Sequence, residues 1–519
     1  MIKSINKFIY TVASMTMISR VLGFIRDVVM ASLFGATALW DSFSIAFEIP
    51  NIIRQLFAEG SLSQAFIPVL VQYQNQSNEK QLKYFIASMI GTLTFILLII
   101  TLGGIFFSSW IVKLIAPGFL VGGVKFTWTV KVLQITFPFL ILSSLTAFFS
   151  AILNTYNRFW VPAITPALLS IAMIIAALCF CSKAEVSIYV LAWAIVIAAV
   201  IQLGFQLWFL KPYRILGRPQ VKFSNPGVKR VIKLMIPLLL GVSVWQINLF
   251  LDSYFASLLQ SGSISWLYFS DRLIDVPIGI FGVAISTVIL PQLARCNLVK
   301  SVHYFSEILD WAFRSALLVG LPSAIFIALL AGPLLSTLFQ HGLLNGYAVA
   351  MSCKSLTVFA IGLTPLILIK ILIVGFYSRQ DMRTPVIVSL AAMILNFIFN
   401  IMFIHRFAHA GIAMATSLSA LFNSIFLYYF LRRLNIYVPL PGWKLFFMKL
   451  FFANSIVALW LYFVTNNVQI WINHLWVWRA MHLALLMISS AIIYIFSLWI
   501  AGVRLKTLEL TQQTINFVT

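Results

Sequence analysis

Positively charged side chains occur inside long apolar segments of this 519-residue chain, where a solvated charge is not expected. The residues concerned are Arg20, Arg26, Arg54, Arg272 and Lys370. A charged side chain at the centre of a bilayer costs roughly 2.5–3.5 kcal/mol on insertion scales. These five side chains are therefore expected to face a wet cavity or to pair with acids.

Pairing has several candidate partners near these cations. The candidates are Asp27, Asp41, Glu48, Glu59, Asp271 and Asp275. Direct neighbours such as Asp271 and Arg272 point to different faces of a helix, so pairing accounts for only part of the set. Arg20 and Arg26 lie about 240° apart around a straight helix and converge only if the helix bends, which Gly23 permits.

A membrane cavity with fixed positive charge selects an anionic ligand. The arginine side chain presents a planar fork of donors that suits a phosphate group. A ligand that enters from the bilayer also needs an apolar part, so an anionic lipid headgroup meets both requirements. Lys370 is less specific, because a lysine near a helix end can extend its ammonium group to the interface.

A second group of polar residues lies in apolar segments of the C-terminal half. It consists of Asp252, the i, i+4 pair Asn396 and Asn400, and Thr416. One carboxylate, two amide oxygens and a hydroxyl suit a hard cation such as Na⁺. The alternative is hydrogen bonding between helices, which Asn and Thr commonly provide in membranes.

The composition predicts an all-α, polytopic membrane protein. The sequence is 61% hydrophobic and only 9% charged, and runs of about 20 apolar residues span a bilayer as helices. We count about 14 such spans, with approximate centres at Met17, Ile53, Thr94, Leu140, Ile171, Ala194, Val244, Gly282, Val319, Ile361, Met393, Ala420, Ile456 and Ser490. The net charge of +22 reflects Lys and Arg in short loops, which places both termini in the cytoplasm and argues against nucleic-acid binding. The sequence has no P-loop or other enzyme signature, so we expect a transporter that does not hydrolyse ATP.

Internal similarities indicate a duplication. Pro68 matches Pro291 and Pro162 matches Pro385, both at an offset of about 223 residues, and ASL followed by Trp occurs near 31–40 and again near 256–266. Six spans per copy give parallel repeats, an arrangement found in transporters. The sequence thus predicts an N-terminal lobe at 1–215, a C-terminal lobe at 216–435 that begins with a basic linker, and an appended pair of helices with a tail at 436–519.

Five long segments together resemble the MurJ/MviN family of lipid II flippases over essentially the whole chain. They are residues 14–27 (SMTMISRVLGFIRD), 41–70, 135–166, 261–291 and 375–386 (GFYSRQDMRTPV). The resemblance implies the multidrug/oligosaccharidyl-lipid/polysaccharide exporter fold. In that fold two six-helix lobes surround a central cavity, and two additional C-terminal helices form a groove for the lipid tail.

The resemblance also implies a substrate and functional residues. The implied substrate is lipid II, the undecaprenyl-diphosphate-linked peptidoglycan precursor, moved from the inner to the outer leaflet of the bacterial inner membrane by a protein we expect to be a monomer. Functionally important family positions match Arg20, Arg26, Arg54 and Arg272, and charged family positions match Asp41 and Glu59. Asp252, Asn396, Asn400 and Thr416 match a sodium site that only some members have.

Two alternatives follow from the same features. The first is an ion-coupled exporter of drugs or of another polysaccharide-lipid from the same superfamily. A pump for cationic drugs needs a cavity dominated by acids, whereas arginines dominate the early spans here. The second alternative is a membrane scaffold that transports nothing, which predicts no phenotype when cavity charges are reversed.

Overall fold

The computed structural model describes residues 2–56, 62–76, 78–120, 123–180, 184–298, 301–465 and 468–503. Over these ranges the chain forms helices and their connections, with no strand. The all-α prediction is therefore confirmed.

Eleven helical segments within the described residues are long and apolar enough to cross a membrane. They correspond to the predicted third to sixth and eighth to fourteenth spans. The predicted first, second and seventh spans coincide with helices outside these eleven, and the first of these carries Arg20, Arg26 and Asp27. The total of fourteen spans stays a prediction.

The chain divides into two compact units, and the first extends to Gly262 and also includes His341–Leu343. Its helices, in chain order, are α1 (Ile2–Phe34), α2 (Ala38–Arg54), α3 (Ser63–Gln76), α4 (Glu79–Phe106), α5 (Ser108–Ile115), η2 (Pro117–Leu120), α6 (Val124–Thr136), α7 (Pro138–Thr155), α8 (Trp160–Phe180), α9 (Ala184–Leu210), η3 (Lys211–Tyr213) and α10 (Pro226–Ser257).

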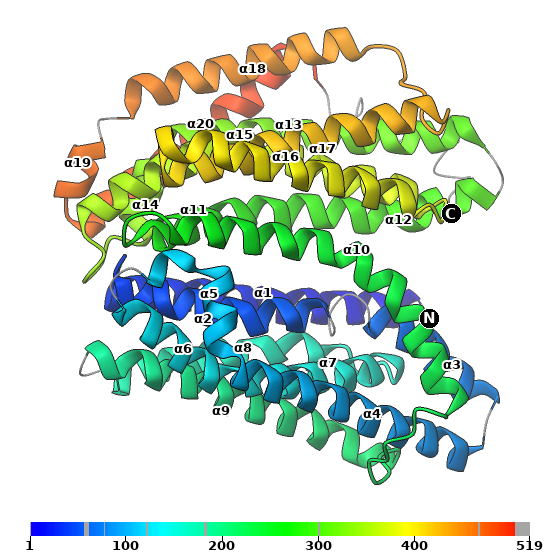
Figure 1. Ribbon diagram of the computed structural model, residues 1–519. Helices are drawn as coiled ribbons and strands as arrows, with labels where there is room; N and C mark the ends of the chain where they lie inside the picture. The colour runs from blue at the N-terminus through cyan, green and yellow to red at the C-terminus, as the bar shows by residue number, and fades with distance from the viewer. Residues whose placement is uncertain are drawn as a thin grey trace. The chain divides into compact units, whose positions relative to one another are not determined.

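Helices α1, α7, α8 and α9 lie alongside one another in the first unit, with α8 packed between α1 and α9 (Figure 1). The inward side of α9 carries two buried glutamines. The Gln206 amide donates to Ser150 Oγ at 2.7 Å and to Thr165 Oγ1 at 3.1 Å, and the Gln202 amide donates to the Thr165 carbonyl at 2.9 Å. Polar side chains thus join helices inside the unit, as expected where lipid offers no hydrogen bonds.

The basic linker after η3 crosses α4 in extended form. The Gln220 N–H donates to the Ala87 carbonyl at 3.1 Å, and the Lys222 N–H donates to Thr92 Oγ1 at 3.3 Å. The helix leaves space for this crossing at Gly91, where a Cβ atom would collide with the Gln220 backbone. Small and hydroxylated residues on one face of α4 therefore position the linker.

The second unit comprises Ser263–Gln340 and the chain from Leu344 onward. Its helices are α11 (Ser263–Pro277), the π-helical η4 (Ile278–Gly282), α12 (Val283–Leu298), α13 (Val302–Leu329), α14 (Ala331–Leu338), α15 (Gly346–Tyr377), α16 (Arg383–Phe407), α17 (His409–Arg433), α18 (Trp443–Val464), α19 (Val468–Asn473) and α20 (Trp476–Ile500).

Helix α15 is central to the second unit, because α11, α13 and α17 all pack against it. Helices α18 and α20 pack against each other, and α18 also packs against α13. An apolar cluster at this junction contains Leu317 and Leu318 of α13 with Phe446 and Leu450 of α18. The predicted appended pair, α18 and α20, is thus anchored to the second unit through α13.

The residues that indicated a duplication occupy corresponding positions in their helices. Pro162 and Pro385 are each the third residue of a helix, α8 and α16, and Pro68 and Pro291 each lie inside a helix, α3 and α12. The compact units meet in sequence at 262–263. The lobe boundary at 215–216 and the separate pair from 436 stay predictions.

Candidate functional site

Arg20 and Arg26 lie on α1, which continues through Gly23 without a break. Arg20 is exposed, whereas the Arg26 side chain is only 17% exposed. Arg26 donates from Nη2 and Nε to Asp27 Oδ1, at 2.7 and 3.0 Å. The direct neighbour thus serves as the partner, because the long guanidinium group reaches around the helix to a carboxylate that is itself buried.

Arg54 is the last residue of α2 and is half-buried. Its Nε and Nη2 atoms donate to Asn51 Oδ1 at 3.1 and 2.9 Å. The arginine is therefore held by an amide one turn earlier. The predicted site residue Glu59 lies outside the described residues.

Asp41 begins α2 and is buried, with 1% of its surface exposed. Its Oδ2 accepts a 2.6 Å hydrogen bond from the Gly262 backbone N–H and lies 3.9 Å from Lys125 Nζ of α6. Sequence reasoning did not select Lys125, since it was counted only among the loop cations. The geometry gives Asp41 a role in joining α2, α6 and the connection that follows α10 inside the first unit.

Arg272 and Lys370 share an acid in the second unit. Arg272 of α11 lies 3.6 Å from Asp275 Oδ2, measured from Nη1, and its guanidinium stacks over Tyr268 at 4.6 Å from the ring centroid. Lys370 of α15 is also attracted by Asp275. The Arg272 and Asp275 side chains are 38% and 55% exposed. Arg272 and Lys370 are thus both drawn to one accessible carboxylate, whose exposure leaves it open to exchange with another anion.

The predicted sodium ligands of the second unit lie together. Asn396 and Asn400 of α16 are fully buried, and Asn400 Nδ2 donates to Asn396 Oδ1 at 2.8 Å. Asn396 Nδ2 donates in turn to Thr416 Oγ1 of α17 at 3.3 Å. This chain of bonds between facing helices is the alternative use expected for Asn and Thr, and its amide and hydroxyl oxygens also suit a hard cation.

Asp252, the fourth predicted sodium ligand, lies on α10 of the first unit and is half-buried. Among the described residues, no group of three or more His, Cys, Asp and Glu side chains could hold a metal ion. Within the second unit, the predicted sodium ligands are therefore the amide and hydroxyl oxygens of Asn396, Asn400 and Thr416 alone.

One cluster that sequence reasoning did not select is built on Asp310 of α13. Its Oδ2 binds Arg314 Nε at 2.7 Å, and its Oδ1 accepts from Tyr437 Oη at 2.8 Å and from Trp443 Nε1 at 2.7 Å. Burial and the adjacent Asp310 carboxylate raise the pKa of Tyr437. The i, i+4 spacing of Asp310 and Arg314 was a visible signal. The cluster fixes the loop that leads into α18.

Comparison with known proteins places these residues in a family. The family model "Lipid II flippase MurJ" matches residues 30–482 of the chain. The chain belongs to the MurJ family of lipid II flippases. The matched range contains Asp41, Arg54, Arg272 and Lys370 together with the four candidate sodium ligands.

Relatives of the MurJ family are similar over nearly their whole lengths. A probable lipid II flippase MurJ of Buchnera aphidicola subsp. Acyrthosiphon pisum is 38% identical over 96% of this chain and 98% of its own. The lipid II flippase MurJ of Burkholderia cenocepacia is 36% identical over 95% and 97%, and the probable flippase of Haemophilus influenzae is 40% identical over 94% and 98%. Arg20 and Arg26 precede the range of the family model. The three relatives, by contrast, match almost the whole chain.

Solved structures support the same fold. A lipid II flippase MurJ in an inward closed conformation matches with a TM-score of 0.79 at 24% identity, over 95% of this chain and 97% of the other. An inward-facing multidrug resistance transporter of the MATE family matches with a TM-score of 0.67 at 12% identity, over 82% and 98%. The MurJ family therefore shares its helical architecture with exporters that handle other cargo, and residue chemistry has to distinguish them.

Proposed function

We propose that this chain moves lipid II from the inner to the outer leaflet of a bacterial inner membrane, with both of its termini in the cytoplasm. The proposal rests on membership of a family whose model and relatives are named as lipid II flippases or probable lipid II flippases. It also rests on arginines placed within apolar helices, which suit the diphosphate of a lipid-linked precursor.

The observation that supports the proposed chemistry is the accessible guanidinium group of Arg272. Its guanidinium is fixed from one side by the Tyr268 ring and is accessible, and its acid partner is exposed and 3.6 Å away. A carboxylate held so loosely can be displaced, because exposed ion pairs contribute only about 0–1 kcal/mol. In the proposed mechanism the diphosphate replaces Asp275 as the partner of Arg272, and Lys370 adds a second positive charge.

The remaining cationic side chains of the proposed mechanism are those of Arg20, Arg26 and Arg54. Arg20 is exposed, and the other two are held by Asp27 and Asn51. Such partners keep a guanidinium oriented before the anion arrives, which lowers the entropic cost of binding. Alternating access then releases the headgroup outside while the lipid tail stays in the bilayer.

The decisive experiment is depletion of this protein in its own cells, followed by measurement of the leaflet in which lipid II accumulates. The expected result is accumulation in the inner leaflet, measured as lipid II protected from a membrane-impermeant reagent added outside. Accumulation in the outer leaflet would exclude the proposal. An exporter of drugs would instead change drug susceptibility and leave the lipid II distribution unchanged.

We also propose Na⁺ as a coupling ion, held by Asp252 with Asn396, Asn400 and Thr416. The buried amide and hydroxyl oxygens on α16 and α17 support this proposal, since they are oxygen ligands of the kind hard cations prefer. An Asp252→Ala variant is expected to abolish any dependence of lipid II transport on Na⁺. Transport that responds to Na⁺ equally in both proteins would exclude this site.

A further inference from the structure

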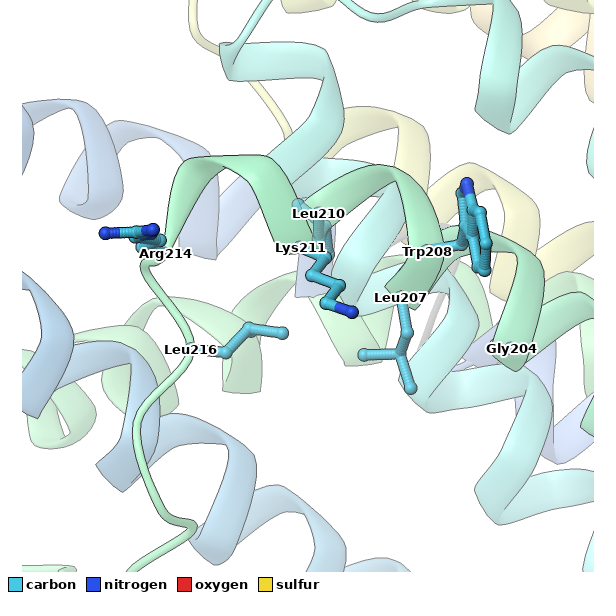
Figure 2. A pocket seen from close by; sticks show the side chains of 7 residues that line it. All are labelled: Gly204, Leu207, Trp208, Leu210, Lys211, Arg214 and Leu216. Carbon is cyan, nitrogen blue, oxygen red and sulfur yellow. The ribbon is translucent and has the colours of Figure 1, made fainter.

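A small groove lies at the end of α9, where the chain turns into the basic linker (Figure 2). It has a volume of about 400 Å³ and is lined by Gly204, Leu207, Trp208, Leu210, Lys211, Arg214 and Leu216. Figure 2 shows Leu216 of the linker directed toward Leu207 and Lys211, with Arg214 at the outer end of the turn. The lining combines an apolar floor with two cations, and none of these seven residues is acidic.

The outward face of α9 continues this groove as an apolar stripe. The stripe consists of exposed residues at helical spacing, Trp193, Ile197, Val200, Ile201 and Trp208, each at least half exposed. Gly204 lies on the same face, and a Cβ atom added there would meet nothing within 4 Å. The opposite face carries the buried Gln202 and Gln206. Helix α9 therefore presents to lipid a long apolar track that ends in positive charge.

The turn that carries the two cations is held in an unusual backbone conformation. Arg214 has φ 49° and ψ 28°, in the left-handed region. Residues other than glycine rarely adopt this conformation, and they do so where the surrounding structure imposes the shape. Two side-chain contacts reinforce the turn, since Arg158 Nε donates to Tyr213 Oη at 3.1 Å and Tyr156 packs on the Tyr213 ring.

We propose that this groove binds the phosphate headgroup of an anionic phospholipid, with the acyl chains lying along the α9 stripe. Lys211 binds the phosphate, Arg214 adds a second positive charge at the outer end of the turn, and Trp208 occupies the interfacial position that tryptophan prefers. Each basic residue near a membrane surface strengthens the attraction of anionic lipid about five-fold. The predicted orientation puts the linker in the cytoplasm, and hence the groove in the inner leaflet.

A phospholipid fits this groove better than the larger lipid-linked precursor of the proposed function. Its lining offers two cations on one short turn, which is enough for one phosphodiester. The acyl chains need no enclosed space, because the stripe is open along α9. The groove is also built entirely from α9, η3 and the linker, and uses none of the arginines assigned to transport.

The test measures lipid retention by the purified full-length protein in detergent, using native mass spectrometry with phosphatidylglycerol as the probe. A Lys211→Ala/Arg214→Ala variant is expected to bind this lipid about 25-fold more weakly than the unmodified protein. The matched control is Arg432→Ala/Arg433→Ala, which removes the same charge from two exposed residues at the end of α17. We expect the control to bind within two-fold of the unmodified protein.

A second variant separates shape from charge. Gly204→Leu fills the groove while every charge is retained, and the open space at Gly204 admits the side chain. It is expected to weaken phosphatidylglycerol binding several-fold with an unchanged unfolding temperature. Equal losses in the two double variants, or unchanged binding in Gly204→Leu, would overturn the proposal. Tighter binding of undecaprenyl diphosphate than of phosphatidylglycerol at these residues would also overturn it.

Discussion

Two arginine–aspartate pairs in the second unit have nearly the same spacing in sequence and differ in almost everything else. Asp310 and Arg314 are 2.7 Å apart, and the aspartate side chain is only 2% exposed. Arg272 and Asp275 are 3.6 Å apart, and both are substantially exposed. The first pair is surrounded by further partners from the loop before α18, whereas the second lies beside another cation. Local spacing therefore creates the pair, and burial decides whether it stabilises the fold or stays available to a ligand.

The largest expected effect is on function. Arg272→Ala is expected to abolish growth of cells that have it as their sole copy, while the protein still accumulates in the membrane, because the variant lacks the accessible phosphate-binding fork. Arg314→Ala is the matched control, since it removes the arginine of the buried pair. We expect that control to reduce protein stability more than transport. Normal growth with Arg272→Ala would remove this residue from the site.

The next effect is on stability. Asp310→Asn is expected to lower the free energy of unfolding by about 3 kcal/mol, because Arg314 then lacks its buried counter-charge. Thermal unfolding of the purified protein in detergent measures the change. Asp275→Asn is the control, and as a surface substitution it is expected to shift stability by no more than about 0.5 kcal/mol. Similar losses of stability in Asp310→Asn and Asp275→Asn would show that the two ion pairs do not differ in their contribution to stability, although they differ in burial.

A smaller effect is expected at Tyr437. Tyr437→Phe removes one hydrogen bond to Asp310 and is expected to cost about 1 kcal/mol near neutral pH. Because the folded protein raises the pKa of this phenol, the unfolded chain loses the proton first, and the stabilisation it provides declines as pH rises above about 10. The difference in unfolding temperature between the two proteins should therefore shrink from pH 8 to pH 11. A difference in unfolding temperature that stays constant from pH 8 to pH 11 would show that the protonated phenol is not the source of the stabilisation.

The smallest expected effect is on ligand binding at the accessible pair of Arg272 and Asp275. Asp275→Asn is expected to tighten binding of undecaprenyl diphosphate by about three-fold, since a competing carboxylate that contributes under 1 kcal/mol has been removed. Titration of the purified protein with this lipid measures the affinity. Weaker binding would instead mean that Asp275 orients Arg272 for the ligand.

The extent of sequence prediction can be judged residue by residue. Apolar runs predicted the long helices, and the five cations within them are found on α1, α2, α11 and α15 as expected. Of the matched prolines, Pro162 and Pro385 occupy the same position in their helices, and the duplication that they indicated stays a prediction. Asn396, Asn400 and Thr416 were grouped correctly, because an i, i+4 pair and a facing helix are short-range features.

Other contacts could not have been predicted in this way. Asp41 meets the backbone of Gly262, 221 residues away, and Asp310 meets Tyr437 and Trp443, more than 120 residues away. The register of Gln220 on Ala87 likewise depends on a glycine that leaves space at the crossing. No local pattern in the sequence predicts these contacts, because each contact depends on how whole helices pack.

By itself, the sequence determined the class of the protein, its long apolar helices, the family and the charges that do not belong in lipid. These properties follow from side-chain type and spacing along the chain, because transfer into a bilayer is governed by the residues of one segment at a time. Only the tertiary structure decided which charges are buried and bound, as at Asp310, and which stay accessible, as at Arg272. Local spacing supplies the counter-charge of both pairs, whereas burial and the additional hydrogen bonds of Asp310 come from residues distant in sequence, which the spacing does not reveal.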